Sequence, residues 1–469
     1  MSDKRKPKAG KNKKGAETRK KTKSAPKTKS ISDGTQSQPN IIVIWADNMG
    51  WADLSSYGCP YYKTPHLDGL AKRGTRFVNA YASAPMCTPS RVGFLTGRYP
   101  GRCRIGVQET LGLPSVVGDK IGLPEDHPTV PSLLQEAGYD TALVGKWHCG
   151  HLPTYSPLKS GFEEYFGHKT GSIDYFRHVD GSGAPDLWEG DELIKTDGYA
   201  TKLFSERAVE FVKRPRSKPF FLTLWYNAPH WPWEGPDDKY LSDEIAGYDS
   251  HRTWIETGTS DNYAEVVKSM DAGIGSVLKA LEEKGLDKNT LVIFSSDQGG
   301  DEMAYFGPYR RGRLHEGGIK VPLIMSWPGV VLRNHVSEQV NIHFDISATI
   351  LSMAGTKPDP NYPTDGDDLS KVFQGKKKEY PRKLFWRHSG NPRPGIPFQK
   401  AMRDGKWKYL KVGKQEFLYD LSKDINEAND LKERYPKKFA AYRKEYRKWE
   451  SKMLPYDKEQ KDFKRVVFK

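Results

Sequence analysis

The amino-acid sequence predicts an α/β fold with a parallel or mixed central sheet, followed by a smaller α+β unit. Three observations support this prediction: continuous apolar runs, helical patterns between those runs, and a change of pattern near residue 375. The chain has 469 residues, which is enough for two or three domains. Apolar residues make up 36% of the chain, so we expect a large buried core.

Five apolar runs, rich in β-branched and aromatic residues, predict strands buried on both faces, as in parallel sheets. These runs span residues 41–46, 141–144, 220–225, 291–294 and 321–325. Helical patterns lie between them at residues 130–137, 199–212 and 263–284. An alternation of strands and helices is typical of a fold in which helices pack against a parallel or mixed sheet.

The composition divides the chain into a basic tail (1–38), an α/β domain (39–375) and a C-terminal antiparallel-sheet and helix subdomain (376–469). Residues 1–35 hold 13 Lys or Arg and three Asp or Glu, so they contribute +10 of the formal net charge of +15. With almost no apolar content, we expect this tail to be disordered. It is either a solvated tail or an anchor for an anionic glycan, nucleic acid or a membrane surface.

Several classes of protein are not expected. No apolar segment of signal-peptide length follows the basic start, and no run approaches the ~18 apolar residues of a transmembrane helix. We therefore expect no export signal and no membrane span. We also expect no nucleic-acid partner. The four cysteines form no C-x-x-C pair and are too few for a disulfide framework.

Polar residues capable of chemistry follow four of the five predicted strands. In open α/β sheets, ligands bind beyond the carboxyl ends of the strands, so we expect these side chains to share one rim. Carboxylate and amide oxygens suit Ca²⁺ or Mg²⁺ better than zinc or copper, although Asp and Asn are also ordinary turn residues. The residues in question are Asp47, Asn48, Lys146, His148, His230, Asp297 and Gln298.

The segment from Cys87 to Arg98 reads C-T-P-S-R-V-G-F-L-T-G-R and resembles the sulfatase signature C-x-P-S-R-x-x-x-L-T-G-R at every fixed position. Other sulfatase landmarks follow the family's order: D-N-M-G at 47–50, G-K-W-H at 145–148, P-H at 229–230, D-Q-G at 297–299, E-G-G at 316–318 and L-Y-D-L at 418–421. The resemblance covers about residues 39–435. It implies an alkaline-phosphatase-like α/β/α sandwich, and a periplasmic or extracellular enzyme, although the compartment stays open.

The resemblance also implies the chemistry of the site. A separate formylglycine-generating enzyme would oxidise Cys87 to formylglycine (3-oxoalanine), and the hydrate of this aldehyde would be the nucleophile. One Ca²⁺, with Mg²⁺ a weaker candidate, would be held by Asp47, Asn48, Cys87, Asp297 and Gln298. Arg91 and Lys146 would neutralise negative charge, and Asp297 would be the base for the attacking hydroxyl. His148 would accept a proton from the second hydroxyl, and His230 would protonate the leaving alcohol.

The sequence departs from the family pattern in its metal and sulfate residues. Asn48 stands where members commonly have Asp, and Gln298 stands where they have Asn or His. With fewer carboxylates we expect calcium to be stripped easily. Arg311 stands near the position of a sulfate-binding Lys. Arg310 or Arg313 are alternatives for that role, and the cluster could also be a solvated basic turn.

The expected substrate is a sulfated carbohydrate or an aryl sulfate. Trp231 and Trp233 follow His230 and could stack on a sugar ring or simply pack in the core, and Asp174 and His178 are further candidates for the substrate pocket. Two alternatives remain open. One is a phosphodiester or phosphonate-ester hydrolase of the same superfamily, and the other is an inactive binder of anionic glycans.

Overall fold

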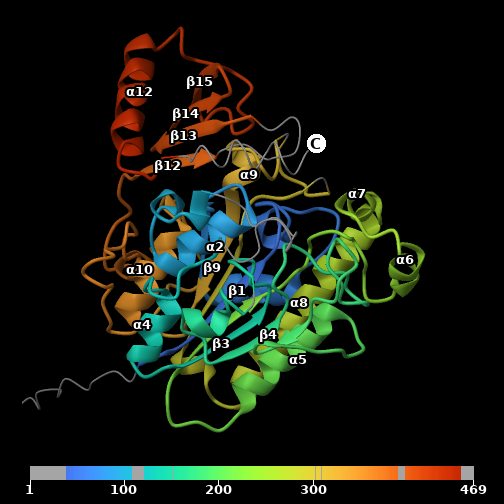
Figure 1. Ribbon diagram of the computed structural model, residues 1–469. Coiled ribbons are helices and arrows are strands. Elements are labelled where there is room, and N and C mark those ends of the chain that lie inside the picture. Colours follow the sequence, from blue (N-terminus) through green and yellow to red (C-terminus); the bar gives the residue numbers. More distant parts are fainter. Residues whose placement is uncertain are drawn as a thin grey trace, which may run out of the picture. The chain divides into compact units, whose positions relative to one another are not determined.

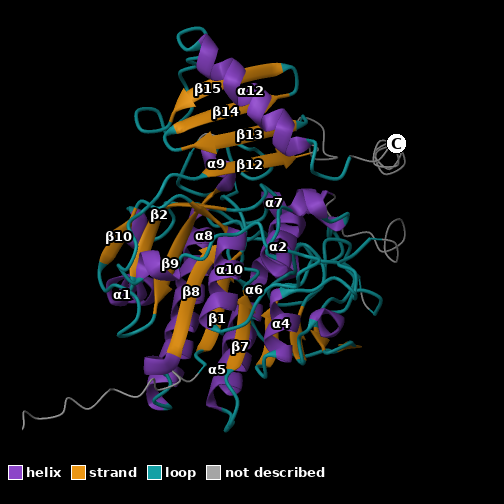
Figure 2. Ribbon diagram, turned by 90° about the vertical axis from the view of Figure 1, so that its left-hand side faces the viewer, coloured by secondary structure: helices purple, strands orange, loops and turns teal. Residues whose placement is uncertain are grey.

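A mixed sheet of eleven strands forms the centre of the described part of the computed structural model (Figure 2). Strands β8, β1, β7 and β3 are parallel to one another, whereas β9 is antiparallel to β8 and to β2. The prediction of a mixed, mainly parallel sheet is confirmed. In order across the sheet the strands are β10 (His335–Ser337), β2 (Thr75–Tyr81), β9 (Lys320–Ser326), β8 (Thr290–Ser296), β1 (Asn40–Ala46), β7 (Phe220–Trp225), β3 (Asp140–Gly145), β4 (Glu164–Gly167), β5 (Trp188–Glu189) and β6 (Glu192–Leu193), and β11 (Asn341–Ile342) also pairs with β2.

Helices cover both faces of this sheet (Figure 1). Strand β1 shows the two layers, because Ile42 and Ile44 belong to one core cluster while Val43 and Trp45 belong to the other. The first cluster includes α1 (Pro65–Arg73), α5 (Ala200–Lys213) and α8 (Ser260–Glu283). The second includes α2 (Cys87–Thr96), α4 (Val130–Glu136) and α10 (His343–Met353). A strand buried on both faces needs apolar residues at every position, which is why its sequence is a continuous run.

The strands that the sequence analysis missed lie toward the edges of the sheet. Strand β2 reads T-R-F-V-N-A-Y and is only partly buried, so its sequence has no continuous apolar run. Helix α2 begins at Cys87, the first residue of the C-T-P-S-R motif. The short helices are α6 (Lys239–Glu244), α7 (His251–Glu256), α9 (Glu316–Ile319) and α11 (Ser370–Phe373).

A separate antiparallel sheet of four strands follows, as predicted for the C-terminal part. Its order is β12 (Lys383–His388), β13 (Gln399–Asp404), β14 (Trp407–Val412) and β15 (Gln415–Asp420). Helix α12 (Pro436–Glu450) packs on one face through Tyr442 and Tyr446. The other face contacts the α/β part, where Trp386 Nε1 donates to the carbonyl oxygen of Ala82 at 2.8 Å. The boundary at residue 375 stays a prediction, because residues from Gln38 onward form one compact unit.

The structure describes residues 38–107, 121–151, 153–301, 303–307, 309–388 and 397–455. The predicted tail, apart from its last residue, therefore lies outside the described residues. Within these ranges, no helix combines the length and the apolar character that crossing a bilayer requires.

Candidate active site

The carboxyl ends of four central strands meet at one rim of the sheet. Ala46 at the end of β1 pairs with Ser296 at the end of β8, and Trp45 pairs with Trp225 at the end of β7. Trp225 also pairs with Gly145, the last residue of β3. The residues that directly follow these strands are therefore brought together, although they come from distant parts of the sequence.

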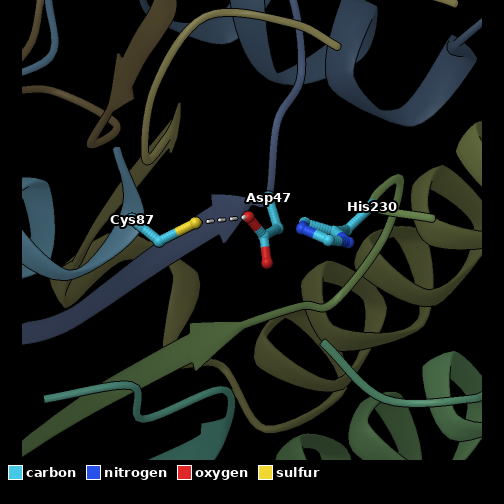
Figure 3. A group of neighbouring side chains, drawn as sticks. All are labelled: Asp47, Cys87 and His230. Carbon is cyan, nitrogen blue, oxygen red and sulfur yellow. Dashed lines mark hydrogen bonds between the residues drawn. The ribbon is translucent and has the colours of Figure 1, made fainter. Parts of the chain in front are cut away.

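Cys87 lies at this rim as the first residue of α2. Its Sγ atom is 3.6 Å from Asp47 Oδ1 and 3.1 Å from Gln298 Nε2. Ligand atoms of Asp47, Cys87 and His230 all lie within 4.8 Å of one another, and Figure 3 shows Asp47 between the thiol and the imidazole. Because the N-terminus of a helix attracts anions, this position suits a bound sulfate.

Two fully buried cations pair with two fully buried carboxylates beside the thiol. Lys146 Nζ is 2.5 Å from Asp47 Oδ2, and an Arg91 guanidinium nitrogen is 3.0 Å from Asp297 Oδ2. Arg91 also donates to the carbonyl oxygen of Lys146 at 3.1 Å. Its guanidinium carbon lies 5.0 Å from the ring centroid of Trp225, which limits its movement. The predicted Arg91 and Lys146 are thus held in place next to Cys87.

The pKa values of these buried groups shift in different directions, because burial and the neighbouring charges act with different strength on each group. Burial, with the charge of Asp297, raises the pKa of Asp47 to about 7 against the opposing effect of Lys146 and Arg91. Burial also acts on Asp297, but Arg91 and Lys146 outweigh it and lower the pKa of that carboxyl. Burial raises the pKa of the Cys87 thiol well above its usual range. An unmodified Cys87 is therefore a neutral thiol and a poor nucleophile at neutral pH.

The oxygen donors at the rim fit a hard divalent cation. The backbone N–H of Asn48 donates to Asp297 Oδ1 at 3.1 Å, and Asn48 adopts a left-handed conformation with φ 62°. The amide of Gln298 contacts Asn48 Oδ1, while Gln298 Oε1 is buried without a hydrogen-bond partner among the described residues. A buried amide oxygen without a hydrogen-bond partner, beside the carboxylates of Asp47 and Asp297, fits the oxygen donor set of a hard divalent cation.

The two histidines are positioned by their own loops. His230 Nδ1 lies 2.7 Å from the carbonyl oxygen of Trp231, and because a carbonyl only accepts, Nδ1 carries the hydrogen. This leaves Nε2 as the atom that can exchange a proton with a substrate. His148 is tied to α2, because its carbonyl oxygen accepts from Thr88 Oγ1 at 2.8 Å.

A glycine is required where β3 turns into the site. Gly145 has φ 106°, and a Cβ atom there would lie 1.9 Å from the carbonyl oxygen of Trp225. The next residue, Lys146, donates its N–H to that same oxygen at 2.8 Å. The glycine in G-K-W-H is therefore needed for the close approach of two strand ends.

The structure distinguishes between the arginines near residue 311. Arg311 is mostly buried, lies 3.3 Å from Asp301 Oδ2 and stacks 5.8 Å from the Trp231 ring centroid. Arg310 donates to the carbonyl oxygen of Asp301, and Arg313 is partly exposed. Asp301 was not predicted as a site residue, although its position four residues after Asp297 in S-D-Q-G-G-D was the available signal.

The remaining predicted substrate residues make packing and turn contacts. Trp231 and Trp233 are each 1% exposed and belong to the core. Asp174 is fully buried, accepts from the backbone N–H of Arg177 at 2.7 Å and pairs with the Arg177 side chain. His178 is also buried and has φ 53°. Their role in substrate binding stays a prediction.

Two family models match the chain. The model described as Sulfatase matches residues 39–356, and the model described as N-sulphoglucosamine sulphohydrolase, C-terminal, matches residues 304–450. The first match spans more than half of the chain, so the chain belongs to the sulfatase family of enzymes and the expected family is confirmed.

Individual relatives agree with this assignment. N-acetylgalactosamine-6-sulfatase of Rattus norvegicus is 34% identical over 365 residues, which are 72% of this chain and 66% of that relative. The alignment thus spans just under two thirds of the relative's length. Arylsulfatase G of Rattus norvegicus is 31% identical over 77% of this chain and 74% of its own length. The crystal structure of Ps i-CgsB has a TM-score of 0.78 and 30% identity, with 92% of this chain and 97% of that chain covered.

Proposed function

We propose that this chain hydrolyses the sulfate esters of a sulfated carbohydrate, or an aryl sulfate. The reaction uses one bound Ca²⁺ and a formylglycine made from Cys87. The observation that supports the proposal most directly is the cluster of Cys87, Asp47 and His230 atoms within 4.8 Å, at the N-terminus of a helix. Buried Lys146 and Arg91 beside it give the site the positive charge that an anionic ester needs.

The chain's own residues have separable roles in this reaction. The hydrate of the formylglycine would supply the nucleophile. A bound Ca²⁺ would polarise the sulfate, and its ligands would be Asp47, Asn48, Asp297, Gln298 and residue 87. Lys146 and Arg91 hold Asp47 and Asp297 in place and offset the charge of the sulfate. His230 Nε2 donates a proton to the leaving alcohol, because its Nδ1 hydrogen already binds the Trp231 carbonyl oxygen. His148 would accept the proton of the second hydroxyl of the hydrate.

Maturation sets a condition on the proposal. Cys87 is fully buried in the folded chain, so a separate formylglycine-generating enzyme must reach it before folding is complete. Mass spectrometry of the Cys87 peptide, after expression with and without such an enzyme, tests this step. An unconverted thiol after expression with a maturation enzyme known to convert a control sulfatase counts against it.

Substrate class is tested on the matured protein. A sulfated carbohydrate is favoured because the relative in Rattus norvegicus is named for a sulfated amino sugar. We expect turnover of a nitrophenyl sulfate and release of sulfate from a panel of sulfated sugars. Faster turnover of the matching nitrophenyl phosphodiester would favour the phosphodiesterase alternative, and sugar binding without turnover would favour the inactive binder.

A further inference from the structure

One carboxylate outside the proposed ligand set receives hydrogen bonds from three parts of the site. Asp301 follows Gly299 and Gly300 in the loop after β8 and is 6% exposed. Its Oδ2 atom accepts from Asn48 Nδ2 at 3.0 Å, from Trp231 Nε1 at 2.9 Å and from Arg311 at 3.3 Å. All three donors converge on one oxygen, and the negative charge of a carboxylate strengthens each of these hydrogen bonds.

The three donors belong to three different functions of the proposed site. Asn48 is a proposed metal ligand, Trp231 follows the proposed acid His230, and Arg311 is the proposed sulfate-binding cation. Asp301 also fixes the chain near Arg311, because its carbonyl oxygen accepts from Arg310 at 2.7 Å. A single buried side chain therefore connects the metal ligand, the acid loop and the substrate cation.

The contact with Asn48 decides which way that amide points. Asp301 only accepts hydrogen bonds, so Asn48 must turn its Nδ2 toward Asp301 and its Oδ1 toward Gln298. Oδ1 is the atom a cation needs. The family's usual Asp at position 48 would instead place two carboxylates about one hydrogen-bond length apart, which is unfavourable for both. The Asn at position 48 is thus matched to the Asp at position 301.

We propose that Asp301 is a positioning residue that orients the Asn48 amide toward the cation, supplies the negative charge that Asn48 lacks, and holds Arg311 against Trp231. The proposal rests on the proposed calcium-dependent function. It explains how a ligand set with only two carboxylates, Asp47 and Asp297, retains a cation: the third charge lies one hydrogen bond outside it.

Calcium titration of the chelated protein by calorimetry tests the proposal without relying on turnover. We expect Asp301→Asn to weaken Ca²⁺ binding by about 10-fold or more, as for other groups that support metal ligands. The swap Asn48→Asp with Asp301→Asn keeps the total charge and restores a carboxylate–amide hydrogen bond. We expect it to bind Ca²⁺ within about 3-fold of the original chain, so that the two substitutions are strongly non-additive.

A matched control separates positioning from general stability. Asp345 is another buried carboxylate that accepts backbone N–H groups, from Ile342 and Asp367 at 2.9 Å each, and pairs with Arg382. Asp345→Asn is expected to lower the melting temperature but to leave Ca²⁺ affinity within about 3-fold. If Asp301→Asn does not fold, Asp301→Glu replaces it, and we expect a smaller loss of Ca²⁺ affinity because the charge remains but moves by one methylene.

Catalysis by the matured protein provides a second readout for Arg311. At saturating Ca²⁺, Asp301→Asn should raise KM about 10-fold with a smaller change in kcat, because Arg311 loses its charged partner.

Unchanged Ca²⁺ affinity in Asp301→Asn, or a swap variant that binds Ca²⁺ as weakly as the single variant, would overturn the proposal. Calcium binding that behaves as expected in a protein without sulfatase turnover would refute the proposed function while leaving the role of Asp301 intact.

Discussion

Two clusters of buried charge in this molecule both pair acidic side chains with Lys and Arg, but they serve different purposes. The active-site cluster joins Asp47 and Asp297 to Lys146 and Arg91, and it includes the adjoining Cys87 and Gln298. The second cluster, which we call the inter-sheet cluster, consists of Glu316, Lys408, Glu427, Tyr81 and Arg403. Lys408 Nζ from the C-terminal sheet lies 2.9 Å from a carboxylate oxygen of Glu316 and 2.9 Å from one of Glu427.

Protein groups contact each carboxylate oxygen of the inter-sheet cluster, although Glu427 Oε1 has an ion pair with Lys408 at 2.9 Å and no hydrogen-bond partner among the described residues. Tyr81 donates to Glu316 Oε2 at 2.6 Å, Arg403 contacts the Tyr81 hydroxyl, and Glu427 accepts from the backbone N–H of Glu316 at 2.6 Å. The active-site cluster instead leaves Gln298 Oε1 without a partner among the described residues. The comparison teaches that similar buried ion pairs connect two sheets in one cluster and surround the proposed nucleophile in the other.

The largest expected effect comes from removing the thiol of the active-site cluster. Cys87→Ala should lower sulfate-ester turnover by about 10³-fold or more, because no nucleophile remains, while the melting temperature changes little. Turnover and thermal unfolding are measured on protein expressed with the maturation enzyme. Cys59→Ala, a buried cysteine outside the site, is the control and should retain turnover. Retained turnover in Cys87→Ala would refute the proposed nucleophile.

The inter-sheet cluster should respond in the opposite way. Lys408→Met leaves Glu316 and Glu427 buried without their shared cation, so we expect a loss of about 3–5 kcal/mol in the free energy of unfolding. Urea unfolding measures this loss. Lys239→Met, which breaks an exposed pair with Asp243, should cost less than about 1 kcal/mol. Equal effects of the two variants would remove the distinction between the clusters.

Calcium removal should affect the active-site cluster alone. Exhaustive chelation should abolish turnover, and added Ca²⁺ should restore it. Relative to protein in a 100-fold excess of Ca²⁺ over Kd, the chelated protein should lose about 3 kcal/mol of unfolding free energy. Full activity after exhaustive chelation would contradict the expected calcium requirement.

The smallest expected effect is a pH dependence of stability from Glu427. Burial and the charge of Glu316 raise the pKa of Glu427 to about 7 despite Lys408, compared with an ordinary value of 4.5. A raised folded-state pKa stabilises the fold below about pH 4.5 and loses that contribution as pH rises toward 7. Glu427→Gln should therefore flatten the decline in unfolding free energy over this range, by about 2 kcal/mol. The unfolding free energy is measured by urea unfolding at several pH values between about 5 and 7. An equally steep decline with pH in Glu427→Gln and in the original chain would contradict this prediction.

The sequence predicted those features of fold and site that depend on local patterning. Strands β1, β3, β7 and β8 are continuous apolar runs because the sheet is covered on both faces, and their carboxyl ends meet because neighbouring parallel strands share a direction. The polar residues that follow these strands could therefore be grouped from their sequence positions alone. Strand β2 was missed because its partial exposure leaves a polar, irregular pattern.

What the sequence determined by itself is the family and the central local structure: the Cys87 motif, the continuous apolar strands, and the polar residues that follow them. Tertiary structure alone decided which residues support that chemistry. Asp301 meets Asn48 across 253 positions of sequence, and Lys408 meets Glu316 across 92. Trp231 meets Asp301 across 70 positions. Such contacts have no local pattern, because their energy depends on burial and on partners that only the folded chain brings together.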